Sequence, residues 1–268
     1  MRARDQAFTL AVTAALLAGP AGAADDSREY GPFVVDHAVL AGLAGTLDVR
    51  ITGGDETRLT VSGPAEALAA LVVEAAAGRL TVEAPPRGHS VTVVDRVTVV
   101  TGPGASSNVV IGGSSASASA SRNVTGAPLD VVLDLPAGSR LELLGFTGDA
   151  TVGDLAGPVR VEAIGGSVRT GAVGDATLAA IGDGRVEAAS VTGDLEASVT
   201  GAGRILVLSG EIGAVAVAVT GAGVVEIDAP AASAVVNMVG DGSVWLAEVA
   251  DEPVVSRVGA GRFSTGPR

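Results

Sequence analysis

A Gly-x-Gly turn recurs through the second half of the chain and restricts the fold more than any other feature of the sequence. Typical copies are residues 200–205 (TGAGRI) and 220–225 (TGAGVV). The second glycine of each copy falls at positions 166, 184, 203, 223, 242 and 261, so successive copies are 18, 19, 20, 19 and 19 residues apart. A fixed period of this length is typical of a chain that winds into stacked coils.

A second series of turns lies about half a period from the first. It reads Gly153-Asp154, Gly174-Asp175, Gly193-Asp194 and Gly210-Glu211. Two turns per coil predict a flattened solenoid with two main strands in each coil. Apolar residues at every second position of a strand are expected to point inward. They form two columns: Val168, Val186, Ile205, Val225, Val244 and Phe263, and Thr170, Ala188, Val207, Ile227, Leu246 and Thr265. The column between them is expected to face solvent: Arg169, Glu187, Leu206, Glu226, Trp245 and Ser264.

The composition suits a thin coil. Hydrophobic residues make up 47% of the chain but aromatic residues only 2%, so the core must be built from many small aliphatic side chains. We therefore predict an all-β protein in which residues 129–268 form a parallel β-helix, or β-solenoid. We expect the coil to be right-handed, with about 19 residues per turn.

The preceding part, residues 24–100, is expected to form strands and hairpins that cap one end of the solenoid. Strands at 47–51 and 59–61 are expected to pair as a hairpin. Pro64 opens a short helical segment at 65–70, because proline fits the first helical position. A second hairpin is expected within residues 71–83, and residues 91–100 (VTVVDRVTVV) predict one β-strand.

Two segments are expected to stand outside the folded part. Residues 1–23 have a basic start, an apolar run at 8–18 and an Ala-Gly-Ala site, which is the order of a secretory signal peptide. That run is too short to span a bilayer, and Gly or charge interrupts every later apolar run, so we expect no membrane span in the mature chain. Residues 101–128 are dominated by Ser, Gly, Ala and Asn, which predicts a flexible loop with a brief strand at 108–111.

The closing segment 258–267 (VGAGRFSTGP) and the Val-Thr-Gly-Ala-Gly repeats at 199–203 and 219–223 resemble the autotransporter adhesin head, or GIN domain, family of bacterial envelope proteins. Residues 33–61 are similar to the start of that family, and residues 132–143 resemble related adhesin-like solenoids. The resemblance implies an all-β fold with a parallel β-helix, export, and an adhesin or envelope role. It brings no catalytic residues.

Charge and composition exclude several classes of function. The formal net charge is −13, which opposes binding to the phosphates of nucleic acid. The chain has no Cys and only two His, so thiol chemistry is excluded and a His-based triad has little material. We expect no catalytic residues and no enzyme activity. The alternative, a glycan-active β-helix enzyme, depends on a charged face made from Arg160, Arg169, Arg185, Arg204, Glu162 and Glu187.

Two sets of residues are candidates for binding. Asp154, Asp175 and Asp194 follow turn glycines and are expected to stack along one edge, continued by Glu211. A bridging Ca²⁺ would relieve their repulsion, and no other cofactor is expected. Alternatively, these residues stabilise turns by bonding nearby backbone. Trp245, with Leu206 two coils earlier, is a candidate contact surface, unless Trp245 packs beneath a neighbouring segment.

These features favour an exported, adhesin-like envelope protein that presents a solenoid surface to an unknown protein or glycan, without catalysis. Its expected location is the periplasm, the outer surface or the extracellular space. The alternatives are a periplasmic structural protein that assembles into homo-oligomers and, less favoured, the glycan-active enzyme.

Overall fold

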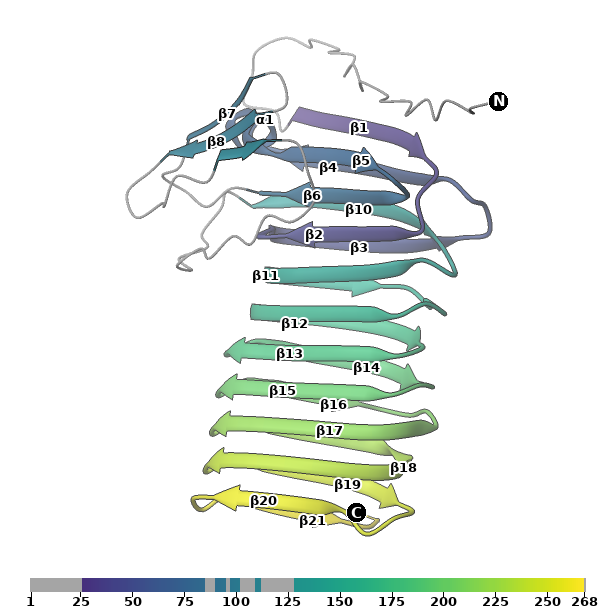
Figure 1. The fold of residues 1–268 in the computed structure, drawn as a ribbon, viewed down its shortest axis with the longest axis vertical. Helices are drawn as coiled ribbons and strands as arrows, with labels where there is room; N and C mark the ends of the chain where they lie inside the picture. The colour runs from purple at the N-terminus through teal and green to yellow at the C-terminus, as the bar shows by residue number, and fades with distance from the viewer. Residues whose placement is uncertain (1–25, 85–89, 95–96, 102–108, 112–127, 268) are drawn as a thin grey trace, which may run out of the picture.

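The computed structural model describes residues 26–84, 90–94, 97–101, 109–111 and 128–267. These residues form a tall stack of short strands with the cap at one end (Figure 1). The expected signal peptide at 1–23 and most of the expected loop at 101–128 lie outside the described residues. In the described part, no helix has the length and apolar character needed to cross a membrane.

The cap is built from the N-terminal elements. They are β1 (Asp26–Phe33), β2 (His37–Ala41), β3 (Ala44–Thr52), β4 (Thr57–Gly63), α1 (Ala65–Ala70), β5 (Val72–Ala76) and β6 (Arg79–Glu83). Helix α1 begins after Pro64, as predicted, and it buries Leu68 completely. Strands β5 and β6 pair in antiparallel fashion, which confirms the second hairpin.

The solenoid is built from the strands after residue 128. They are β10 (Leu129–Pro136), β11 (Arg140–Val152), β12 (Val159–Val173), β13 (Ala176–Gly182), β14 (Arg185–Val191), β15 (Leu195–Gly201), β16 (Arg204–Val207), β17 (Ile212–Gly221), β18 (Val224–Gly240), β19 (Ser243–Val249), β20 (Val254–Val258) and β21 (Arg262–Thr265). Its turns lie roughly 19 residues apart, which confirms the predicted all-β solenoid and its period.

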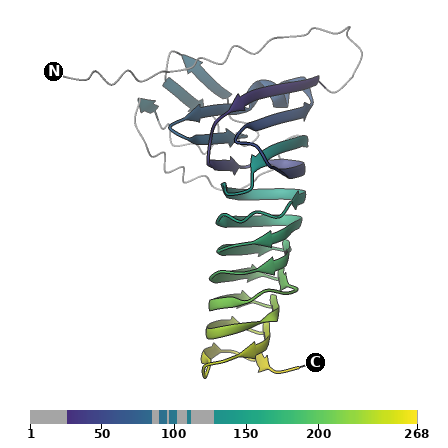
Figure 2. The same ribbon diagram turned by 90° about the vertical axis from the view of Figure 1, so that its right-hand side faces the viewer.

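Each coil gives one strand to each of two facing sheets, as the turned view shows (Figure 2). The first, here called the groove sheet, runs β5-β6-β2-β11-β12-β13-β15-β17-β18-β20. The second, here called the Trp245 sheet, runs β1-β4-β10-β3-β11-β12-β14-β16-β18-β19-β21. Strands β11, β12 and β18 are long enough to bend from one sheet to the other, so they appear in both.

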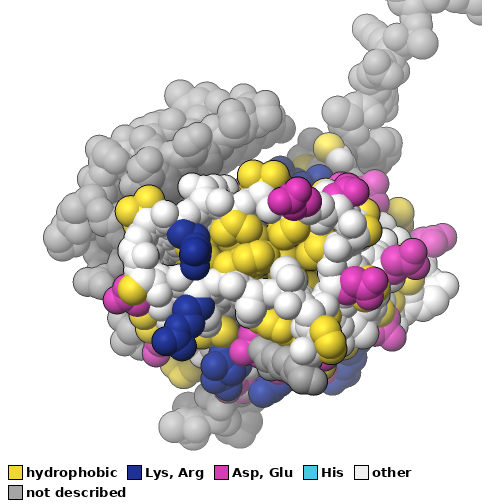
Figure 3. All heavy atoms as spheres, turned by 90° about the horizontal axis from the view of Figure 1, so that it is seen from below, with side chains coloured by type: hydrophobic (Ala, Val, Ile, Leu, Met, Phe, Trp, Pro, Cys, Tyr) yellow, Lys and Arg dark blue, Asp and Glu magenta, His cyan; other side chains and the backbone are white. Residues whose placement is uncertain are grey.

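The strand register places the predicted inward columns inside the coil. Val168, Val186, Ile205, Val225 and Val244 pair in succession and are almost completely buried. The last coil differs because it has a neighbour on one side only: Phe263 is half-buried and Thr265 is exposed. Figure 3 shows hydrophobic side chains gathered at the centre of this end, with charged side chains towards the rim.

The expected hairpin between β3 and β4 is wrong. The two strands do not pair; β10 lies between them, parallel to β3 and antiparallel to β4. The sequence of β10 alternates with period two and buries Leu129, Val131, Leu133 and Leu135, so it fits a sheet interior. A strand that arrives from far along the chain therefore joins the cap to the solenoid.

The single strand expected at 91–100 is also wrong. The structure has an antiparallel pair, β7 (Ser90–Val94) and β8 (Val97–Thr101). In the sequence, Asp95 and Arg96 interrupt the Val- and Thr-rich run, and aspartate is depleted in strands. A third strand, β9 (Val109–Ile111), pairs with β8 and agrees with the brief strand expected there.

Candidate functional site

A groove runs along the outer surface of the groove sheet, close to the edge where the coils turn. It crosses β11, β12, β13, β15, β17 and β18 and has a volume of about 560 Å³. Side chains alternate between the inside and the outside along each strand. In every coil, the residue next to a buried one therefore points outward and forms part of the floor of the groove. The floor column is Arg160, Thr177, Glu196, Ala216 and Val235, which pair in this order.

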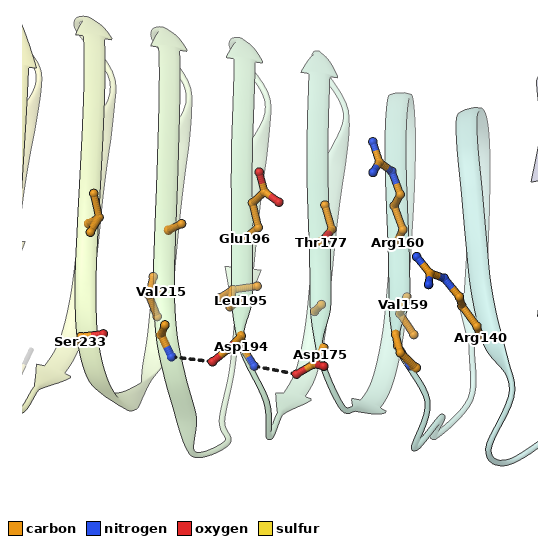
Figure 4. A pocket seen from close by; sticks show the side chains of 15 residues that line it. Arg140, Val159, Arg160, Asp175, Thr177, Asp194, Leu195, Glu196, Val215 and Ser233 are labelled. Carbon is orange, nitrogen blue, oxygen red and sulfur yellow. Dashed lines mark hydrogen bonds between the residues drawn. The ribbon is translucent and has the colours of Figure 1, made fainter. Parts of the chain in front are cut away.

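The end of the groove nearest the cap is basic. Arg140 and Arg160 line it, and both side chains reach over the sheet (Figure 4). Glu142 forms an ion pair with Arg140: its Oε1 lies 3.1 Å from Arg140 Nε and 3.1 Å from His37 Nε2. Arg160 is exposed and forms no hydrogen bond or ion pair with another described residue.

The middle of the groove is acidic. Asp175 and Asp194 form its wall, and Glu196 stands on its floor (Figure 4). The two aspartates are held by backbone: Asp175 Oδ1 accepts the N–H of Asp194 at 2.9 Å, and Asp194 Oδ1 accepts the N–H of Ala214 at 2.9 Å. Their charges are therefore fixed against the sheet, whereas the exposed Glu196 carboxylate projects into solvent.

The far end of the groove is uncharged. Ala214, Ala216, Ser233 and Val235 line it. Four exposed valines lie on the outer face here and beyond it: Val235, Val239, Val254 and Val258 are between 45% and 65% exposed. Val235 pairs with Val254 and Val239 with Val258, and the exposed Asn237 and Ser256 pair between them, so the four valines form two apolar pairs across β18 and β20.

The acidic residues that were expected to form one stack lie at different places around the coil. Only Asp175 and Asp194 occupy equivalent places in successive coils. Asp154 lies beside Ala172, whose N–H it accepts at 2.8 Å, and Glu211 follows Gly210, which bridges to Val191. Within the described ranges, no group of three His, Cys, Asp or Glu residues is placed to hold a metal ion.

Trp245 and Leu206 lie on the opposite sheet from the groove. They share the predicted outward column, with Glu226 between them. Both are half-buried, and Trp245 Nε1 donates to the Gly266 carbonyl at 3.2 Å. This contact agrees with the alternative stated for Trp245, in which a neighbouring segment of the same chain packs against it.

The charged residues that the enzyme alternative requires on one face lie on two different sheets. Arg160 and Glu162 lie on the groove sheet, whereas Arg169, Arg185, Arg204 and Glu187 lie on the Trp245 sheet. The two sets are separated by the core of the coil. The grouping failed because β12 bends, which takes Arg160 and Arg169 to different sheets although they are close in sequence.

Comparison with protein families decides the classification. The model of the family described as "Putative auto-transporter adhesin, head GIN domain" matches residues 42–252, which include most of the cap and nearly all of the coils. This chain belongs to the head GIN domain family.

A solved structure shows the same fold for this GIN domain. A putative adhesin from Bacteroides fragilis is 15% identical, with 91% of this chain and 98% of that chain covered and a TM-score of 0.58. A putative adhesin from Parabacteroides distasonis is 12% identical, with 91% and 97% covered and a TM-score of 0.47. No curated protein matches the sequence.

Sequence reasoning missed the groove of this GIN domain, although one signal for it was present. The second turn series predicts a strand after each Gly-Asp or Gly-Glu pair, and outward positions of those strands read Arg160, Thr177, Glu196 and Ala216. The column after the Gly-x-Gly turns carries the stronger signal, because it contains the one Trp of the chain. The repeat spacing does not say which of the two faces is hollowed, since that depends on side-chain size along the edge.

Proposed function

We propose that this protein is an exported, adhesin-like module of the cell envelope that binds a partner through its groove sheet and catalyses no reaction. The family description and the names of the related structures support an adhesin-like role. The observation that carries the choice of surface is the groove itself, because it concentrates basic, acidic and apolar side chains along one line of the solenoid.

Binding to cells tests the role and the surface together. Labelled protein is added to intact cells of the encoding bacterium from which the gene has been deleted, and bound label is measured against competing unlabelled protein. We expect saturable binding that Arg160→Glu weakens and Arg204→Glu leaves unchanged. The two arginines are both exposed and undergo the same change of charge, but they lie on opposite sheets. Equal losses in both variants would point to net charge instead of the groove, and absence of saturable binding would refute the role.

Location is the second test. Protease treatment of intact cells and osmotic shock are compared in parallel. Removal by protease without release by shock places the protein on the outer surface, as an adhesin requires. Release by shock with protection from protease would refute adhesion to external targets.

One observation favours the structural alternative. The four exposed valines of β18 and β20 form two apolar pairs on one outer face, and apolar side chains gathered on an exposed face mark protein contacts. Under this alternative the chain assembles with itself, and its mass in solution rises with concentration without any other ligand.

A further inference from the structure

The groove has the dimensions of a single extended chain. It crosses six strands, and neighbouring strands lie about 4.8 Å apart, so it is roughly 24 Å long. A volume of about 560 Å³ spread over that length leaves a cross-section only one chain wide. That width matches an extended peptide or a glycan chain.

The charges along the floor follow a fixed order. Arg160, Glu196 and Val235 are each separated by one intervening strand in the same column, with Thr177 and Ala216 between them. Basic, acidic and apolar positions therefore follow at intervals of two strand spacings, or about 9.6 Å. Arg160 and Glu196 have no ion-pair partner among the described residues, so both are available to a ligand.

This interval matches one kind of polypeptide. A polyproline II helix has three residues per turn and rises about 3.1 Å per residue, so its side chains at i, i+3 and i+6 lie on one side, about 9.3 Å apart. A β-strand ligand repeats every second residue, near 7 Å, and does not match. A glycan fits less well, because none of the lining residues is aromatic and a polyanion would meet Asp175, Asp194 and Glu196.

We propose that the groove binds an extended, polyproline II-like segment of a partner protein whose residues i, i+3 and i+6 are acidic, basic and apolar. The acidic side chain faces Arg160, with Arg140 beside it, the basic one faces Glu196, and the apolar one faces Val235. Such a segment has no internal backbone hydrogen bonds, so its N–H groups are free to bond the carboxylates of Asp175 and Asp194. The inference deepens the proposed function and rests on it, since it names the partner of the same groove.

Synthetic peptides test the order of charges. The matched probe is acetyl-Pro-Asp-Pro-Pro-Lys-Pro-Pro-Val-Pro-amide, and in the control Asp and Lys are exchanged while composition and net charge stay the same. Binding of fluorescein-labelled peptides to the full chain is followed by anisotropy at low salt, where exposed charge pairs are least screened. We expect the matched peptide to bind at least about fivefold more tightly than the exchanged one.

A charge swap in the protein completes the test. The double variant Arg160→Glu with Glu196→Arg should prefer the exchanged peptide, and its thermal unfolding should match the wild type because both side chains are exposed. Equal binding of both peptides, binding of neither, or an unchanged preference in the double variant would overturn the proposal. So would tighter binding of oligogalacturonate than of the matched peptide, which would identify an acidic glycan as the ligand.

Failure of this inference can be told apart from failure of the proposed function. If cells bind the wild type and the double variant equally while the peptides fail, the adhesin role stands and the peptide groove falls. If cells bind neither protein but the peptides behave as expected, the groove stands and the cell-surface role falls.

Discussion

Asp175 Oδ1 accepts a hydrogen bond from the backbone N–H of Asp194, its equivalent one coil further along the solenoid, at 2.9 Å. Asp194 repeats the arrangement with Ala214 in the next coil. The contact leaves no room for a side chain at the residue before each bonded N–H, and that residue is Gly193 in one coil and Gly213 in the next. Gly193 and Gly213 are thus explained by the carboxylates of the preceding coil, whereas Gly174 and Gly210 of the second turn series lie against the backbone carbonyls of Ala156 and Val191.

Replacing Gly193 with Ala tests this packing. Its Cβ would overlap Asp175 Oδ1 and would approach the Asp175 backbone N to 2.9 Å, so the carboxylate must move and the coils must separate. We expect a loss of about 1–3 kcal/mol of unfolding free energy, measured by chemical denaturation. Gly138→Ala is the matched control, because a Cβ there has no atom within 4 Å. Equal effects of the two substitutions would show that the Asp175 contact is not what requires Gly193.

Substitution of Asp175 separates the hydrogen bond from the charge. Asp175→Asn keeps an oxygen that accepts the Asp194 N–H, whereas Asp175→Ala does not. We expect the Asn variant to unfold near the wild type and the Ala variant to lose about 1 kcal/mol, seen as a fall in Tm of a few degrees. A large loss in the Asn variant would instead mean that the negative charge of Asp175 is required for stability.

The sequence predicted the spacing of these aspartates but not their alignment. The intervals of the second turn series are uneven, because the corner between the sheets takes a different number of residues in each coil. Asp154 therefore lies beside Ala172, and Asp175 beside Asp194, although both follow a glycine. Alignment across a solenoid depends on the strand register on each side of a turn, which a repeat length alone does not specify.

The Gly-x-Gly turns depend on backbone conformation as well as space. Gly221 has φ of +109° and lies over Gly201, so a Cβ would come 2.7 Å from the Gly201 carbonyl oxygen. We expect Gly221→Ala to cost about 2 kcal/mol, because Ala rarely adopts this φ and would also clash. Ala222→Ser, at the exposed neighbouring position, should leave the denaturation midpoint within error. A tolerated Gly221→Ala would mean that the turns can change conformation without disturbing the stack.

The regular coils could be predicted because each coil contains its own copy of the repeat. The strand pairing of the cap could not be predicted, because the strands that pair there are distant in sequence. The column from Val168 to Val244 follows directly from the period and the alternation. The insertion of β10 between β3 and β4 pairs Asp130 with Ser62 and Leu129 with Gly45, which are far apart in sequence, and local turn signals at Gly53-Gly54 favoured the simpler hairpin. A hairpin and an inserted strand require the same alternation in β3 and β4, so only the three-dimensional pairing distinguishes them.

Trp245 contributes to stability through its contact with Gly266. Because its Nε1–H donates to the Gly266 carbonyl, Trp245→Phe removes the bond and keeps most of the apolar packing. We expect a loss of about 1 kcal/mol, or a fall in Tm of roughly 2–4 °C for a chain of this size. Ser264→Ala, in the same outward column but exposed, serves as the control. An unchanged Tm in Trp245→Phe would show that the Gly266 contact does not persist in solution.

Adjacent valines of β18 test both the orientation of the strand and the alternative of self-assembly. Val235 is 45% exposed and Val236 is fully buried, so Lys at 235 should change the unfolding free energy by less than about 0.5 kcal/mol, whereas Lys at 236 should prevent folding. Sedimentation velocity then compares the wild type with Val235→Lys over a range of concentrations. Under the leading proposal both sediment as the same species, because the apolar end of the groove is reserved for a partner. A wild type whose mass rises with concentration while that of Val235→Lys stays constant would favour self-assembly, since a lysine beside Val254 opposes burial of these side chains against a second copy.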